Sequence, residues 1–297
     1  MGCCCPKQLP DEFDFSSVKF KDGSPCTVRL LRPGDSYKND ALDIMVSSFC
    51  GTKDRIGELM FDWVLGDSSG NTIARESEDR ANQFRFVLTI LFGSCLRYGV
   101  VVGLFDQIEG KEVLVAVAAL ERSDRTPAYE GWNVLCTIPP LLKKAYPLMK
   151  YDFTSKGPKD VQHRAKVFNK YSTKDRNAIF TLLKKNMKTA GVNFKKEYFY
   201  FAVCIGTHPV FQGKGYGRMV MEAIDCVARG TEGIPRPIYL ECCREGNIGF
   251  YRDKCGYVEE CGRVFETSGY ACKRENVYMI KHANGRVFPS GKIEDLK

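Results

Sequence analysis

Three glycines at alternate positions, Gly213, Gly215 and Gly217, constrain the fold of this chain more than any other short stretch. They lie in THPVFQGKGYGRMVMEAI, between a β-forming run and a helical pattern over about residues 216–228. Because glycine lacks a Cβ, successive N–H groups can approach a ligand closely, and the start of the following helix adds a partial positive charge. A strand, a glycine loop and a helix in this order predict a site for phosphate groups, of the kind found in a nucleotide-like pyrophosphate.

Two familiar phosphate-binding motifs do not match this loop. The nucleoside-triphosphate motif GxxxxGK[ST] is absent. A dinucleotide-binding fold is a stronger alternative interpretation of the loop, because Glu241 lies near the end of the next strand, where a ribose-binding acid can lie. It fails on spacing, since the glycines run GxGxG and HPVFQ separates them from the strand. A turn with a purely structural role is the remaining alternative.

Length and composition indicate a globular protein. A chain of 297 residues with 44% hydrophobic content can bury a large core, in one large domain or two small ones. Its fourteen cysteines show no zinc-like CxxC spacing and no signal-peptide pattern precedes them, so we expect reduced, buried thiols and no metal. No run of eighteen apolar residues predicts a transmembrane helix.

The net charge of +8 is unevenly distributed. Residues 143–196 contain fifteen Lys or Arg against three Asp, which is +12, so the rest of the chain sums to −4. This segment mixes basic and aromatic residues in KVFNKYSTKDRNAIFTLLKK, a pattern compatible with an anionic surface or, more commonly, with a solvated helix face.

Periodicity and turn signals predict one α/β domain. We expect strands at residues 26–31, 197–205 and 237–242, a hairpin over residues 98–121 and a closing hairpin formed by residues 257–266 and 276–282. Helices are expected at about residues 37–49 and 78–96, through most of 126–191, and in a short segment that stops near Gly256. The expected divisions are a tail at 1–20, the domain at 21–285 with a basic helical insertion at 122–196, and a second tail at 286–297.

Two motifs together resemble the GNAT superfamily of acyl-CoA-dependent N-acetyltransferases. QGKGYG matches the pyrophosphate loop Q/R-x-x-G-x-G/A, and LECCREGNIGFYRDKCGY is similar to the strand and Asn-initiated helix that follow it in this family. The sequences of both motifs look most like those of the puromycin N-acetyltransferase-like branch. The resemblance implies a central mixed, mostly antiparallel sheet, splayed between its fourth and fifth strands and flanked by helices, with a helical insertion between the third and fourth.

The resemblance also implies how acetyl-CoA is held. Its pantetheine would pair like an extra strand with the backbone of Cys204, Ile205 and Thr207, which would polarise the thioester carbonyl. The expected cofactor-binding residues are completed by Gln212, Gly213, Lys214, Gly215, Tyr216, Gly217, Arg218 and Asn247. For Asn247, an ordinary helix N-cap is the alternative role.

Two residues are the expected catalytic groups. Tyr251 matches the family's tyrosine near the CoA sulfur and would protonate the leaving thiolate, unless it is a core aromatic residue. Some family members place acidic or histidine side chains on the fourth strand, but the matching Phe201 and Val203 are apolar here. Glu241 is therefore the candidate base, with a solvent-facing strand-end acid as the alternative. His208 is expected to be structural.

The N-terminus, MGCCCPKQLP, suggests lipidation. Gly2 is the acceptor position for myristoylation and Cys3, Cys4 and Cys5 suit palmitoylation, although Pro6 departs from the expected Ser or Thr. The alternative is an unmodified tail. With the basic insertion, two lipids would place a cytoplasmic enzyme on the cytoplasmic face of an anionic membrane.

Three function classes follow from these observations. The leading one is direct acetyl transfer from acetyl-CoA to a primary amine of a small molecule, with a protein lysine or N-terminus as the alternative acceptor. The second is a CoA-binding module without catalysis. The third is an adaptor that binds a membrane or, less in keeping with the sequence, nucleic acid through the basic segment.

Overall fold

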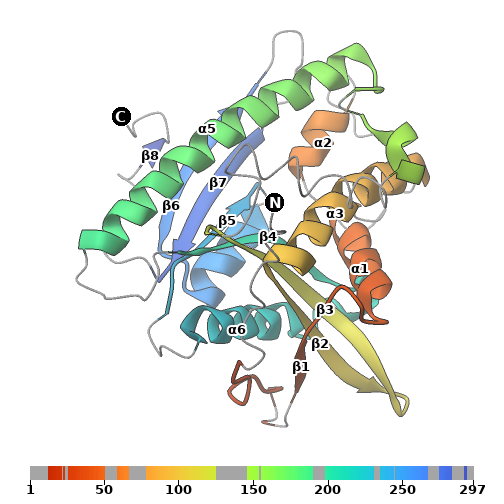
Figure 1. The fold of residues 1–297 in the computed structure, drawn as a ribbon, viewed down its shortest axis with the longest axis vertical. Helices are drawn as coiled ribbons and strands as arrows, with labels where there is room; N and C mark the ends of the chain where they lie inside the picture. The colour runs from red at the N-terminus through yellow and green to blue at the C-terminus, as the bar shows by residue number, and fades with distance from the viewer. Residues whose placement is uncertain are drawn as a thin grey trace, which may run out of the picture.

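A single eight-stranded sheet organises the part of the chain that the structure describes (Figure 1). This computed structural model describes residues 13–21, 23, 26–50, 59–66, 78–124, 146–153, 155–189, 198–230, 235–243, 245–266, 274–282 and 291–292. The strands are β1 (Thr27–Leu30), β2 (Val100–Ile108), β3 (Lys111–Arg122), β4 (Tyr200–Thr207), β5 (Ile238–Cys242), β6 (Glu259–Phe265), β7 (Arg274–Lys281) and β8 (Gly291–Lys292). They are ordered β1-β2-β3-β4-β5-β7-β6-β8.

The sheet is mixed and mostly antiparallel, as the sequence predicts. Strand β4 pairs in parallel with β5, and β6 with β8, whereas the other neighbouring pairs are antiparallel. The β2–β3 hairpin turns at Glu109 and Gly110, which both have positive φ, as the mirror-image hairpin turns require. In the closing hairpin, β7 lies against β5 and β6 lies outside it.

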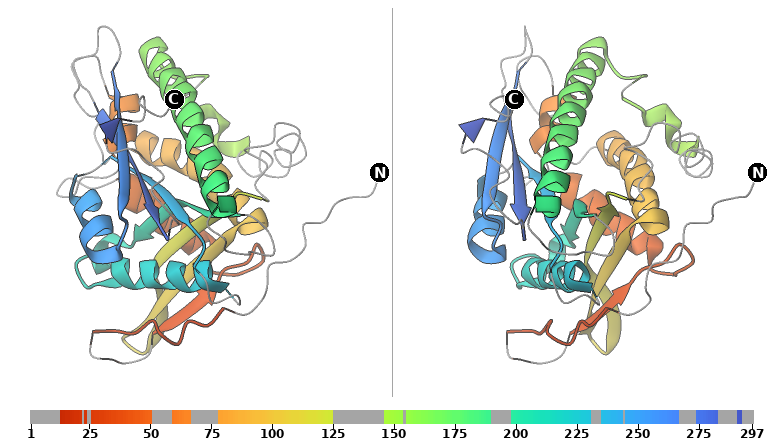
Figure 2. Two further views of the ribbon diagram at one scale, coloured as in Figure 1. Left: turned by 90° about the vertical axis from the view of Figure 1, so that its left-hand side faces the viewer. Right: turned by 60° about the vertical axis from the view of Figure 1, so that its left-hand side comes forward.

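Helices cover both faces of the sheet (Figures 1 and 2). They are α1 (Lys38–Cys50), α2 (Leu59–Leu65), α3 (Glu78–Tyr98), α5 (Lys159–Thr189), α6 (Tyr216–Arg229) and α7 (Glu245–Gly249), with a π-helix at Phe250–Lys254 and short 3₁₀ turns at Tyr146–Tyr151 and Pro209–Phe211. Helix α6 packs on one face, whereas α1, α2, α3 and α5 lie on the other. Because both faces are covered, most of β3 is buried on both sides, which explains its continuous apolar run VLVAVAAL.

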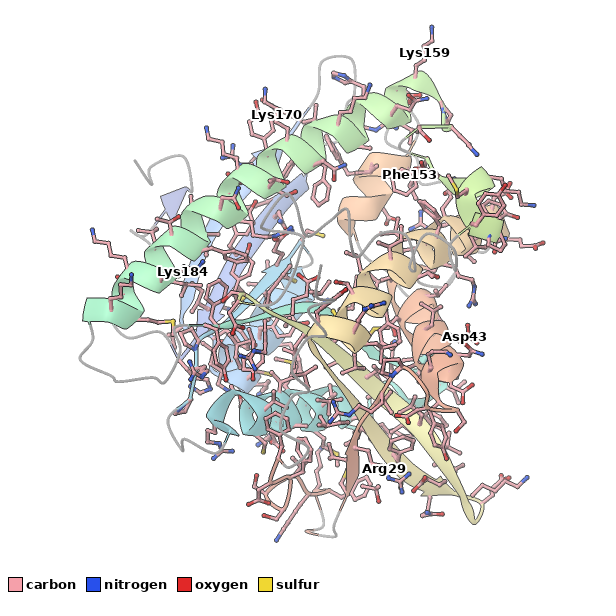
Figure 3. All side chains as sticks on the ribbon, in the orientation of Figure 1. Arg29, Asp43, Phe153, Lys159, Lys170 and Lys184 are labelled. Carbon is pink, nitrogen blue, oxygen red and sulfur yellow. The ribbon has the colours of Figure 1, made fainter. Side chains whose placement is uncertain are left out.

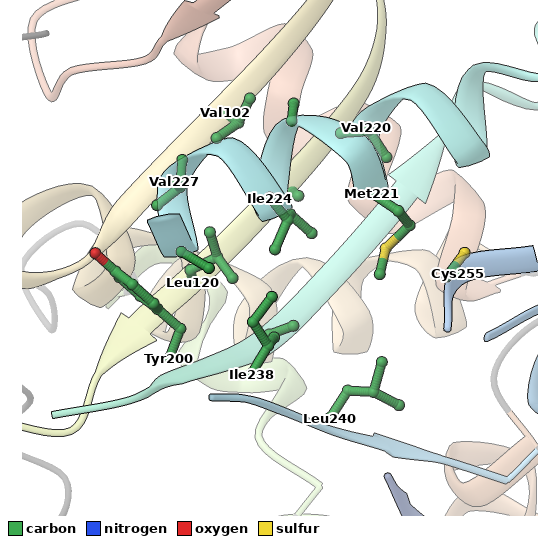
Figure 4. Close-up of a cluster of buried hydrophobic side chains, with 14 of the residues drawn as sticks. Val102, Leu120, Tyr200, Val220, Met221, Ile224, Val227, Ile238, Leu240 and Cys255 are labelled. Atoms are coloured by element: carbon green, nitrogen blue, oxygen red, sulfur yellow. The ribbon is translucent and has the colours of Figure 1, made fainter. Parts of the chain in front are cut away.

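The α6 face holds the largest buried cluster (Figure 4). Val220, Ile224 and Val227 recur at helical spacing and pack against Leu120 of β3 and Ile238 of β5. Burying each of these side chains contributes about 1.5–3 kcal/mol before the entropy of ordering is subtracted. The helix that follows the glycine loop is therefore held firmly against β3 and β5.

Most of the predicted elements are confirmed, including β1, α1, α3, the β2–β3 hairpin, β5 and the helical insertion, where α5 alone spans 31 residues. All nine cysteines that the structure describes are free, and all but Cys26 are buried, as expected. Helix α2 was not predicted from the sequence.

Both predicted tails contain described residues that pair or pack. Residues 13–20 fall in the expected N-terminal tail, yet Val18 is 1% exposed and belongs to the α6 cluster. Strand β8 falls in the expected C-terminal tail and pairs with β6. The Gly2 to Cys5 motif lies outside the described residues.

Candidate functional site

A β-bulge opens the sheet between β4 and β5. Ala119 pairs with Cys204 and Leu120 pairs with Ala202, so Val203 is left out of the pairing between β3 and β4. Bulges bend a strand and increase its local twist. Pairing with β5 stops at the same place, since the last pair joins Ala202 to Leu240. Residues 203–207 of β4 therefore diverge from β5, and they include all three positions expected to hold pantetheine.

The glycine loop has the conformation that its residues predict. Gly213 has φ 83° and Gly215 has φ 94°, in the left-handed region that favours glycine. A Cβ at either position would meet no described atom within 4 Å, so the space over the loop is open. Gly215 is also the N-cap residue of α6 and brings no side-chain oxygen to its first N–H groups. These features fit an anion held by backbone N–H groups and the positive end of α6.

Two side chains fix this loop to the end of β4. The Gln212 amide donates to the carbonyl of Thr207 at 3.1 Å, and Ser48 of α1 donates to the same oxygen at 2.9 Å. The Nδ1 atom of His208 accepts from the backbone of Val210, consistent with its expected structural role. Gln212 thus positions the loop through its side chain, and the carbonyl of Thr207 is already engaged.

The other loop residues differ in what their side chains do. Tyr216 is 5% exposed and its hydroxyl donates to Asp106 of β2. Burial, followed by this hydrogen bond, raises the pKa of Tyr216 to about 12. Its side chain therefore supports the helix start, which leaves its backbone to face a ligand. Lys214 lies over the ring of Phe211, and Arg218 forms an exposed ion pair with Glu222.

The second motif forms a helix with a widened turn. Helix α7 begins at Glu245, so Asn247 lies within its first turn, and the N-cap alternative for Asn247 is wrong. The π-helix follows at once, and such widened turns are frequent at functional sites. Tyr251 lies in it, half-buried, with its ring 5.7 Å from that of Tyr257. The segment ends as predicted at Gly256, which has φ 74°.

The π-helix lies beside the glycine loop. A Cβ placed on Gly217 would be 3.8 Å from the ring of Phe250 and 3.7 Å from Oγ1 of Thr207. Gly217 therefore packs the start of α6 against both the end of β4 and the helix that carries Tyr251. The two motifs, separate in the sequence, meet at the opening between β4 and β5.

Glu241 follows the last β4–β5 pair by one position, and its side chain reaches α5 on the opposite face from α6. Its Oε1 accepts from Arg176 of α5 at 2.8 Å and 3.0 Å and from the hydroxyl of Tyr239 at 2.9 Å. Its Oε2 accepts from Asn276 at 3.3 Å. The side chain is 13% exposed, so Glu241 is not a solvent-facing strand-end acid.

A buried ion pair lies next to this partly buried one. Asp175 of α5 accepts from Arg263 of β6 at 2.6 Å and from the hydroxyl of Tyr278 of β7 at 2.8 Å. Burial raises the pKa of the Tyr278 hydroxyl, and that of Tyr239 as well, so both remain hydrogen-bond donors. The two pairs join α5 to β5, β6 and β7 on the face of the sheet opposite α6.

Three features of the site escaped the sequence analysis: the bulge at Val203, the partners of Glu241 and the ion pair at Asp175. Arg176 and Glu241 are 65 residues apart, and Arg263 and Asp175 are 88 apart. The dipeptide Asp175–Arg176 in the middle of an amphipathic helix was the one local signal, and adjacent opposite charges are common on exposed helices.

Comparison with known families finds a match over part of the chain. The model of the acetyltransferase (GNAT) family matches residues 144–257. No curated protein matches the sequence.

Several solved structures also resemble the chain. Arylalkylamine N-acetyltransferase 2 from Aedes aegypti is 12% identical, with coverage of 86% of this chain and 98% of that one and a TM-score of 0.43. Polyamine N-acetyltransferase from Drosophila melanogaster is 12% identical, with 87% and 100% covered and a TM-score of 0.38. A Corynebacterium glutamicum protein described as a histone acetyltransferase and related acetyltransferase is 13% identical, with 89% and 98% covered and a TM-score of 0.43.

Proposed function

Since the chain carries an acetyltransferase domain of the GNAT family, we propose that it transfers an acetyl group from acetyl-CoA directly to a primary amine, with a small molecule as the acceptor. The observation that carries this proposal is the juxtaposition of the β4–β5 opening with an uncapped, glycine-lined helix start. The backbone of Cys204, Ile205 and Thr207 would hold the pantetheine arm, and the loop would hold the pyrophosphate. Bound acetyl-CoA supplies the acetyl group as a thioester.

Tyr251 is the proposed general acid. A phenol hydroxyl can donate its proton to a leaving thiolate. The contact between Gly217 and Phe250 supports this role, because it brings the π-helix to the end of β4. Tyr251 is half-buried, so part of its side chain is exposed.

Glu241 is the proposed base, and its partners define how it would act. Oε1 accepts three hydrogen bonds from Arg176 and Tyr239, whereas Oε2 accepts the longer bond from Asn276. We therefore assign proton acceptance to Oε2, directly or through one water. The ion pair with Arg176 fixes the orientation of the carboxylate.

The charge on α5 supports a small acceptor over a lysine-rich peptide. Seven lysines are exposed along its outer side, with Asp160 as the exposed carboxylate of this helix (Figure 3). The seven are Lys159, Lys166, Lys170, Lys174, Lys184, Lys185 and Lys188. Because like charges repel an approaching polycation, histone tails and polyamines are disfavoured acceptors. An amine attached to an uncharged or acidic body fits best.

The same lysine face supports a proposed membrane association on the cytoplasmic side. Each lysine near an anionic bilayer contributes up to about 1 kcal/mol, and acylation at Gly2 and Cys3 to Cys5 would supply the stable anchor. Phe13 and Phe15 join the α6 cluster, whereas α5 lies on the other face, so the tail and the lysines are separate contributions. Among the helices of the described residues, none is long and apolar enough to cross a bilayer.

A turnover screen tests the proposed enzyme. Purified protein is incubated with acetyl-CoA and a panel of small amines, polyamines and histone peptides, and products are identified by mass. Acetylation of small amines is the expected result. Acetylation of peptides alone would instead establish a protein acetyltransferase. CoA binding without turnover of any amine in the panel would favour a binding module, and the absence of CoA binding would refute the cofactor assignment.

A further inference from the structure

An open cavity of about 700 Å³ lies at the start of α6, beside the glycine loop. Its lining includes Lys214, Gly215 and Arg218 of the loop and helix. It also includes Lys19 and Lys21, in the described N-terminal segment that neither motif includes. Two segments almost 200 residues apart thus form one basic cavity.

The N-terminal segment is packed in place by its alternate residues. Val18 is 1% exposed within the α6 cluster, and the ring of Phe20 meets that of Tyr216 edge-on at 6.2 Å. The Ser17 hydroxyl lies 3.3 Å from the thiol of Cys226 on α6. Because Val18 and Phe20 face the domain, the intervening Lys19 and the following Lys21 are exposed at the cavity.

The charges that line the cavity favour an anion. Four cationic side chains, Lys19, Lys21, Lys214 and Arg218, face two carboxylates, so the lining carries a net charge of +2. The two carboxylates already have partners, since Asp106 accepts from Tyr216 and Glu222 accepts from Arg218 at 2.9 Å. The partial positive charge at the start of α6 adds to this field.

We propose that Lys19 and Lys21 bind the 3′-phosphate of CoA. This inference rests on the proposed function, in which the adjacent loop holds the pyrophosphate of the same molecule. The 3′-phosphomonoester is the other anionic group of CoA and carries close to two negative charges at neutral pH. Two lysines line the same cavity as the glycine loop, and this cavity is large enough for part of a nucleotide. Their ammonium groups match the phosphomonoester in charge and belong to a cavity beside the proposed pyrophosphate site.

The test compares CoA with 3′-dephospho-CoA, which differs only in that phosphate. Affinities are measured by calorimetry for the parent, a Lys19→Ala/Lys21→Ala variant and a Lys166→Ala/Lys170→Ala control. The control removes the same charge from the exposed face of α5, on the other side of the sheet. All four lysines are exposed, so we expect folded variants, which thermal unfolding verifies.

We expect the parent to bind CoA about tenfold more tightly than 3′-dephospho-CoA, the effect of two exposed ion pairs. The Lys19/Lys21 variant should lose this preference while binding 3′-dephospho-CoA as the parent does, and the control should keep it. A parent that binds both nucleotides equally would overturn this inference but not the proposed function. A Lys19/Lys21 variant that still prefers CoA to 3′-dephospho-CoA would do the same. A parent that binds neither nucleotide would overturn the proposed function as well.

Discussion

Gly215 permits a test in which backbone strain and cofactor binding are separated. Its φ of 94° is unfavourable for any residue with a Cβ, yet a Cβ there meets no described atom within 4 Å. Gly215→Ala therefore adds backbone strain without a clash in the protein. Strain of this kind costs about 1–3 kcal/mol, which lowers the Tm of a domain of this size by roughly 2–10 °C.

Gly230 provides the matched control, because it ends the same helix. It has φ 50°, and a Cβ there also meets no described atom within 4 Å. Gly230→Ala should therefore destabilise the fold to a similar degree. It lies at the opposite end of α6 from the loop and should leave CoA binding unchanged.

The two variants should separate in a CoA titration. If the N–H groups of the loop hold the pyrophosphate, Gly215→Ala alters their direction and should weaken CoA binding tenfold or more, since a hydrogen bond to a charged group contributes about 1.5–3 kcal/mol. Gly215→Glu, which adds bulk and a like charge, should abolish binding in a folded protein. Parent-like affinity in Gly215→Ala and Gly215→Glu, or an equal loss in Gly230→Ala, would refute the assignment of the loop.

Three further variants test the other assignments. Tyr251→Phe should lower kcat by about 10²-fold with nearly unchanged acetyl-CoA affinity. Full activity of this variant would indicate that Tyr251 is a core aromatic residue and not the general acid. Glu241→Gln should lower kcat/KM and remove the acidic limb of the pH–rate profile, because the glutamate must be ionised to accept a proton; a profile that superimposes on the parent's would exclude Glu241 as the base. Gly2→Ala, or replacement of Cys3 to Cys5 by serine, should move the protein from the membrane to the soluble fraction, and a parent found soluble under the same conditions would contradict the anchor.

The local elements and the glycine loop can be predicted from short stretches of the sequence. Helical spacing around Ile44, alternating strands and the turn at Gly110 depend on neighbours within a few residues, so their patterns are legible in the chain. The positive φ of Gly213 and Gly215 follows from the same local chemistry, since few other residues adopt it. The two motifs were sufficient to indicate the resemblance to the GNAT family and the sheet with its splay.

The register of β4, the partners of Glu241 and the packing of the N-terminal segment depend on contacts between distant parts of the chain. The bulge at Val203 depends on how β4 aligns with β3. The local sequence pattern does not distinguish Val203 from the residues before and after it on β4 as the one left out of the pairing. Glu241 acquires Arg176 as its partner because the core places α5 across β5, 65 residues away in the chain. Lys19 joins the cavity because Val18 is buried beneath α6. These contacts arise from long-range packing, whose energetics are shared over the whole core and leave no signal within a short window of sequence.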